Sequence, residues 1–302
     1  GPILGGVLAE YFSWHLIFWL YIPIVIFGLV MSFILVKPRE VKKSPFPFMA
    51  TLLMVVGVVA FVTGLMEGNS WGWSTSWILV FVVVGPIFVV MFVIASLAAH
   101  SPLTDFTLMK SSLFAGAVIT RFIAYLLVTV AVLWVVFFEK ELGQTPAEIG
   151  LLMVIAALPV IALAPIGGII ADRYWYRLPL MLGFVLLVCG FCWIIFTAKT
   201  ELLWCYLPGL CSFGIALPFI MAPTLALGLS SVPAEQLGSA AGIMMSARQL
   251  ASTIGIAIMT ALYYSQQPIS GFVAISLFSL ILSALGLFIV MLLVRQKDSL
   301  PH

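Results

Sequence analysis

Long stretches without a single charged residue are the feature that most limits what this chain can fold into. Such stretches in the 302-residue chain include 44–66, 68–104, 149–171, 178–198, 202–234 and 249–294. A helix needs about 20 consecutive apolar residues to cross the hydrocarbon core of a bilayer. Inside lipid every backbone amide must find its partner within the protein, and a continuous apolar run does so as a helix. The sequence therefore predicts an all-α polytopic membrane protein.

The composition excludes several other classes of protein. Hydrophobic residues make up 64% of the chain and charged residues 8%, whereas a soluble domain has about 25% charged residues. A water-soluble enzyme and a nucleic-acid-binding domain are therefore excluded. Cys189 and Cys192 have metal-like spacing, but no His or carboxylate lies beside them, so we predict structural thiols, no metal site and no cofactor.

The polar breaks between the apolar runs define about nine full spans. We expect them at 16–36, 47–66, 77–99, 112–138, 149–171, 178–197, 202–230, 237–264 and 271–294. A further apolar segment, 1–9, rises only about 14 Å as a helix, half of a bilayer. We interpret it as a partial first helix of an N-terminally truncated chain.

Basic residues predict the orientation of the spans. If the connection at 37–46 is cytoplasmic, only Lys140 and Lys199 face outward. Nine basic residues then face inward, namely Lys37, Arg39, Lys42, Lys43, Lys110, Arg173, Arg177, Arg295 and Lys297. This bias follows the positive-inside rule. It predicts a multi-pass protein of the cell (inner or plasma) membrane with a cytoplasmic C-terminus.

The chain opens on a proline among small residues. Glycines let helix backbones approach closely, and proline bends a helix. The residues are Gly1, Pro2, Gly5 and Gly6. With the W-x-x-I-F-x-x-x-x-P segment at 14–23, this G-P-x-x-G-G pattern resembles the fifth-helix antiporter motif and the sixth-helix entry of the major facilitator superfamily.

A second motif joins two spans on the predicted cytoplasmic side. It consists of Gly168, Asp172, Arg173 and Arg177, and it resembles the superfamily's loop motif, with Trp175 where the family usually has glycine. An acid at a helix end can pair with basic groups or with a facing helix N-terminus. The resemblance implies a contact that holds one transporter conformation; the alternative is that these charges only anchor the loop in solvent.

A third motif begins at Pro233 and continues through Arg248 and Gln249. It is similar to the thirteenth helix of the fourteen-span drug/proton antiporter branch (EmrB/QacA-like) of the superfamily. Gly238, Gly242 and Ser246 recur every fourth residue. This spacing predicts one smooth face for a neighbouring helix.

The resemblance covers nearly the whole chain and implies three parts. Residues 1–36 would end the N-terminal half, with partial helix five and helix six. Residues 37–99 would form a cytoplasmic loop and two inserted linker helices, and residues 100–302 the C-terminal six-helix half with a cytoplasmic tail. Helices one to four would be missing.

Two arginines fall inside predicted spans, Arg121 and Arg248, and Gln249 follows the second. A cation near the bilayer centre costs about 2.5–3.5 kcal/mol on insertion scales, so each must face a cavity, a partner or carbonyl groups. For Arg248 we weigh a substrate- or proton-path role against packing, and for Arg121 we favour packing. All eleven carboxylates fall in loops or at span ends, so we expect a coupling carboxylate in the missing helices.

These observations predict a secondary active transporter rather than an enzyme. The three histidines are far apart in the predicted topology, and no H-E-x-x-H motif occurs. The resemblance implies export of small hydrophobic or amphipathic compounds, including cationic drugs, by proton antiport through alternating access. Its partners would be a small-molecule substrate, protons and the lipid bilayer. A siderophore or metabolite exporter of the same superfamily, or a non-transporting membrane remnant or scaffold, remains an alternative.

Overall fold

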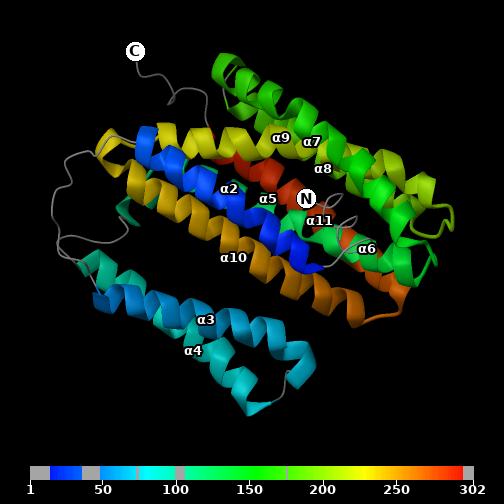
Figure 1. The fold of residues 1–302 in the computed structure, drawn as a ribbon, viewed down its shortest axis with the longest axis horizontal. Helices are drawn as coiled ribbons and strands as arrows, with labels where there is room; N and C mark the ends of the chain where they lie inside the picture. The colour runs from blue at the N-terminus through cyan, green and yellow to red at the C-terminus, as the bar shows by residue number, and fades with distance from the viewer. Residues whose placement is uncertain (1–13, 36–47, 73–74, 99–105, 175, 295–302) are drawn as a thin grey trace.

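A computed structural model describes residues 14–35, 48–72, 75–98, 106–174 and 176–294. Every regular element in these ranges is helical (Figure 1). The α-helices are α2 (Trp14–Leu35), α3 (Phe48–Trp71), α4 (Ser76–Ala98), α5 (Ser112–Val128), α6 (Val130–Lys140), α7 (Pro146–Tyr174), α8 (Arg177–Thr197), α9 (Leu207–Ser230), α10 (Leu237–Tyr264) and α11 (Pro268–Leu293). Short 3-10 turns occupy Phe106–Lys110, Leu203–Tyr206 and Ala234–Gln236.

The predicted spans and the observed helices agree closely. Within the described ranges, 7 helices are long and apolar enough to cross a membrane, with α5 and α6 forming one span. Tyr21–Leu35 of α2 and Phe48–Gly64 of α3 are further apolar stretches, in helices of 22 and 24 residues. The all-α polytopic architecture is therefore confirmed, while the partial first helix at 1–9 lies outside the described residues.

Local sequence explains where α7 begins. The Thr145 Oγ1 atom accepts a bond from the Glu148 amide at 3.3 Å, and a Glu148 carboxylate oxygen accepts one from the Thr145 amide at 2.9 Å. This reciprocal pair is a capping box, which satisfies two of the amides that a helix start leaves unpaired. Pro146 suits the first helical position because it has no amide hydrogen to leave unpaired.

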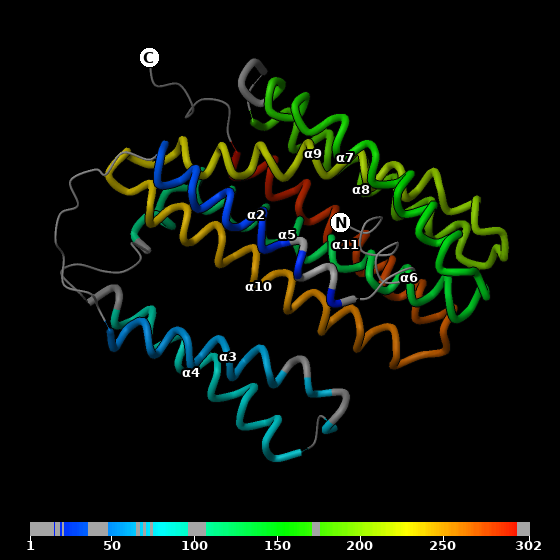
Figure 2. Tube along the Cα trace, viewed as in Figure 1, coloured from blue at the N-terminus to red at the C-terminus, as the bar shows by residue number. Residues whose placement is uncertain are grey.

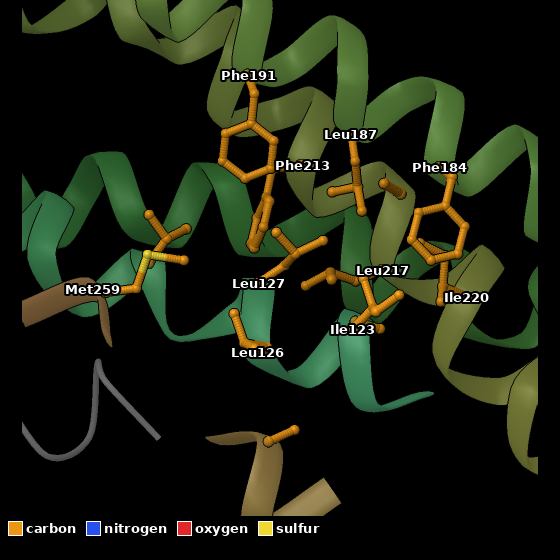
Figure 3. Packing of buried hydrophobic residues seen from close by; sticks show 14 of the residues in the cluster. Ile123, Leu126, Leu127, Phe184, Leu187, Phe191, Phe213, Leu217, Ile220 and Met259 are labelled. Carbon is orange, nitrogen blue, oxygen red and sulfur yellow. The ribbon is translucent and has the colours of Figure 1, made fainter. Parts of the chain in front are cut away.

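The core of the structure surrounds α5. This helix packs against α9, α10 and α11, and α8 closes the far side by packing against α9 and α11. Figure 3 shows Ile123 and Leu127 of α5 directed toward side chains of α8 and α9. The labelled partners are Phe184, Leu187 and Phe191 from α8 and Phe213, Leu217 and Ile220 from α9. α7 lies outside this group and packs against α9.

The hairpin of α3 and α4 stands apart from this bundle. The two helices pack mainly against each other (Figures 1 and 2). Glycine makes that packing close, since a Cβ atom on Gly85 would lie 2.6 Å from the Phe61 backbone nitrogen. The hairpin touches the bundle chiefly where α3 meets α10.

One span is interrupted at Thr129, between α5 and α6. Its amide and its Oγ1 atom both bond the Leu126 carbonyl, at 3.3 Å and 2.6 Å. These i to i−3 bonds replace the α-helical ladder for one turn. Gly255 of α10 passes this point so closely that a Cβ atom there would lie 2.6 Å from the Thr129 hydroxyl.

Three buried serines line α11. Ser276, Ser279 and Ser283 are fully buried, and each donates its hydroxyl to the carbonyl four residues earlier, at 2.7–2.8 Å. A buried hydroxyl is costly unless it is hydrogen-bonded. Because each serine is satisfied within its own helix, this polar stripe packs as though it were apolar.

The closest backbone approach within the bundle joins α7 and α9. A Cβ atom on Gly167 would lie 2.5 Å from the Pro218 carbonyl oxygen, and one on Gly214 would collide with the Ala156 carbonyl oxygen. Both obstacles are backbone atoms that cannot turn away. The two helices therefore hold their spacing only while both positions lack a side chain.

Gly167→Ala should accordingly destabilise the protein by about 1–3 kcal/mol, the usual cost of overpacking. Thermal unfolding in detergent measures the effect. Gly150→Ala is the matched control, since it lies on the same helix and its Cβ atom would meet nothing within 4 Å. Equal unfolding midpoints for the two variants would contradict the α7–α9 crossing described here.

Candidate functional site

A buried arginine lies in the middle of the α5 span. Arg121 is 3% exposed, and its Nη1 atom donates to the Met221 carbonyl of α9 at 3.3 Å. Its Nε atom is buried and has no hydrogen-bond partner within the described part of the chain. Arg121 lies nine residues beyond Ser112, so a rise of 1.5 Å per residue puts it roughly 14 Å into the span.

The ring of Tyr125 joins this arginine to the second one. Tyr125 follows Arg121 by four residues, a spacing that places both on one face of α5. The Arg121 guanidinium carbon lies 5.0 Å from the centre of the Tyr125 ring. The Arg248 guanidinium carbon, from α10, lies 5.0 Å from the same centre. The two arginines are thus no farther apart than twice that distance.

Arg248 lies on an open face of α10. Arg248 and Gln249 are exposed, and Met245, Gly242 and Gly238 are exposed on the same side of the helix. No atom lies within 4 Å of where a Cβ atom would stand on Gly238 or Gly242. The described residues thus leave this face open at both glycines, and the prediction that a neighbouring helix packs there stays a prediction.

The charges at this site are poorly compensated. Placing a cation near the bilayer centre costs about 2.5–3.5 kcal/mol, and a cation–π contact returns about 0.5–2 kcal/mol. The two guanidinium groups also approach the same Tyr125 ring, and like charges repel each other. Among the described residues, the buried polar set contains no Asp or Glu. The site is therefore strongly electropositive at membrane depth.

Of the three predicted intramembrane polar residues, Arg121 and Arg248 form a pair, and Gln249 lies beside it in the chain. Arg121 and Arg248 meet through Tyr125, as the sequence did not foresee. The Gln249 carbonyl accepts the Thr253 hydroxyl, and the Arg248 carbonyl accepts the Ser252 hydroxyl. The contacts described for Ser252 and Gln249 therefore serve the α10 backbone and not the guanidinium.

The two other predicted motifs are only partly described. Gly1, Pro2, Gly5 and Gly6 lie outside the described residues, as do the side chains of Asp172 and Arg173. Arg177, at the start of α8, donates from Nη2 to the Met291 carbonyl at 3.4 Å. Met291 belongs to the last turn of α11, where unpaired carbonyls favour a cation. Gly168 of α7 has open space where a Cβ atom would stand.

Other large or polar side chains of the bundle are packed in its core. Trp134 is 2% exposed, and its ring centre lies 5.0 Å from that of Phe213. Met244 is fully buried, and Thr224 donates to the Ile220 carbonyl at 2.7 Å. Polarity or size alone did not distinguish them from Tyr125, whose sequence signal is its place four residues after Arg121.

The chain belongs to the Major Facilitator Superfamily, whose model matches residues 113–302. The match covers the helices that surround the arginine pair. Membership of a family of transporters confirms the prediction that the chain is a polytopic membrane protein of the transporter class and not an enzyme.

Similar curated proteins are named for drug resistance. The multidrug resistance protein Stp of Mycobacterium tuberculosis is 29% identical over 262 residues, which cover 86% of this chain and 48% of Stp. The tetracenomycin C resistance and export protein of Streptomyces glaucescens is 26% identical over 276 residues, covering 88% of this chain and 50% of that protein.

The quinolone resistance protein NorB of Staphylococcus aureus is 23% identical over 307 residues, covering 98% of this chain and 66% of NorB. The chain thus spans about half to two thirds of the length of these curated relatives. Their names agree with the drug-antiporter branch that the motifs resemble.

A stability measurement can test whether the structure needs Arg121. Replacing a buried charge by an apolar residue of similar volume is often neutral or stabilising. We therefore expect Arg121→Met to change the free energy of unfolding by no more than about 1 kcal/mol, as measured by thermal unfolding in detergent. Leu127→Ala, at a fully buried position of the same helix, should cost about 2–5 kcal/mol. A comparable loss in both variants would assign Arg121 to packing.

Proposed function

We propose that this chain is part of a secondary active transporter that exports small hydrophobic or amphipathic compounds across the cell membrane by proton antiport. The observation that carries the proposal is the arginine pair at mid-span of a major facilitator bundle, with Arg121 buried on α5 and Arg248 on the open face of α10. Uncompensated charge at membrane depth is characteristic of substrate and ion paths. The drug-resistance names of the relatives support export as the direction.

The mechanism that we propose is alternating access, in which two helical halves rock around a central site. Residues 100–302 would form one half, and 1–36 would belong to the other. Residues 37–99 would contribute the linker hairpin of α3 and α4. The opening resemblance at Gly1, Pro2, Gly5 and Gly6 supports antiport, and Arg177 would help to hold one conformation through its bond to the end of α11.

An efflux assay tests this proposal. The full-length gene would be expressed in a host whose own drug pumps are deleted, and accumulation of a panel of dyes and antibiotics would be measured. We expect lowered accumulation of some compounds, restored by a protonophore. Arg248→Ala should reduce export about tenfold or more, which corresponds to a loss of about 1.4 kcal/mol of transition-state stabilisation.

Lys199→Ala serves as the control for that assay, since it removes one cation from the exposed turn after α8. It should leave export unchanged. Export that persists undiminished in Arg248→Ala, or that is insensitive to the protonophore, would contradict the proposal.

We also propose that the C-terminus and the connection at 37–46 are cytoplasmic. The structure places the α6–α7, α8–α9 and α10–α11 connections at one end of the bundle and the α9–α10 connection at the other (Figure 1). In a cysteine-free background, Ser44→Cys should react with a membrane-impermeant maleimide only after the membrane is opened. Ser270→Cys should react in intact cells. Labelling of both positions from one side would overturn this topology.

A further inference from the structure

The cluster formed by Arg121, Tyr125 and Arg248 has the composition of an anion site. Each guanidinium presents a planar set of donors that matches a carboxylate or phosphate oxyanion with two parallel hydrogen bonds. The Nε atom of Arg121 is buried and has no hydrogen-bond partner among the described residues. In the described part of the chain, the groups that meet the two guanidiniums are the Tyr125 ring and a backbone carbonyl, and neither carries a negative charge.

The two arginines differ in their exposure, so a ligand would approach the cluster from the side of the exposed one. Arg121 is buried, whereas Arg248 is exposed on the open face of α10. A ligand that arrives at that face therefore meets the Arg248 guanidinium first. The guanidinium of the buried Arg121 approaches the same Tyr125 ring. Both positions are about equally deep, since Arg248 follows Leu237 by eleven residues and Arg121 follows Ser112 by nine. The pair thus marks one place near the middle of the membrane.

The surroundings of the pair are apolar. Met221, whose carbonyl accepts from Arg121, is half-buried, and Met245 is exposed one turn before Arg248. Methionine side chains are flexible and adapt to bodies of different shape. A fitting ligand therefore has an apolar body and a single anionic end, and a permanent cation would be repelled from the same place.

We propose that the Arg121–Tyr125–Arg248 cluster binds the carboxylate end of amphipathic substrates, so that the transporter recognises anionic or zwitterionic compounds and excludes permanent cations from this place. The proposal rests on the transport function proposed above and narrows its substrate class. The same oxyanion chemistry could be supplied by a lipid phosphate, and the test separates the two sources.

The experiment measures binding rather than transport, so that its outcome is independent of the efflux assay. The full-length protein would be placed in phosphatidylcholine nanodiscs and titrated with three dansyl probes of equal length. One ends in a carboxylate, one in its methyl ester and one in a trimethylammonium group. We expect the carboxylate probe to bind at least tenfold more tightly than the ester, and the trimethylammonium probe to bind more weakly than the ester.

Substitutions then assign the binding to the cluster. Arg248→Ala should weaken the carboxylate probe tenfold or more and leave the ester unchanged, while Arg248→Lys should recover only part of the loss, because an ammonium is a point charge. Lys140→Ala is the matched control. Its ammonium lies 6.0 Å from the ring centre of Tyr264, so it removes another cation from another tyrosine, and the affinities should not change.

Three outcomes would overturn the proposal. Equal affinity for the carboxylate and ester probes would mean that no free anion site exists, for example because another carboxylate of the protein already holds the arginines. An unchanged carboxylate affinity in folded Arg248→Ala would place the anion elsewhere. Weaker carboxylate binding in phosphatidylglycerol than in phosphatidylcholine nanodiscs, by a factor that disappears in Arg248→Ala, would identify a lipid headgroup as the occupant, because general repulsion by an anionic surface would persist in the variant.

Discussion

The absence of water inside a bilayer governs this structure. No solvent is there to hydrogen-bond a free amide, hydroxyl or guanidinium, so each polar group must find a partner in the protein or carry the cost of having none. The backbone meets this condition by forming helices. The buried hydroxyls of Thr129, Thr224 and the α11 serines meet it by bonding carbonyls of their own helices. The arginine pair meets it only in part, and within the described residues the buried polar atoms of Thr120, Trp134 and Tyr263 also have no hydrogen-bond partner. Among these groups only the arginines carry a full charge.

The same constraint explains what could be read from the sequence. Helices had to occupy the charge-free runs, and short polar breaks had to join them, so the spans were predicted almost residue by residue. The capping box at Thr145 and Glu148 was equally local. The core was not predictable in this way, because a lipid-facing side chain is as apolar as a buried one. Phe184 and Leu187 of α8 are fully buried, while Leu182 and Val185 beside them are exposed, and no period in the sequence separates the two sets.

For a related reason, the sequence predicted the residues of the candidate site only in part. An arginine within an apolar run is conspicuous, and both intramembrane arginines were found from the sequence alone. Their meeting depends on how α5 and α10 cross, which involves residues 127 positions apart in the chain. The spacing of Arg121 and Tyr125 could have pointed to the ring. The Met221 carbonyl that accepts from Arg121 could not have been predicted, because every residue has a backbone carbonyl whatever its side chain.

The self-bonded serines of α11 have a mechanical consequence. Interfaces that are held by directional bonds between helices must break those bonds before they can shift. Ser276, Ser279 and Ser283 donate their hydroxyls to carbonyls of their own helix. The surface that they present to neighbouring helices is therefore held by van der Waals packing. Such a surface permits the small sliding displacements known as shear. α11 is thereby suited to slide by small displacements in which these three hydroxyls keep their hydrogen bonds.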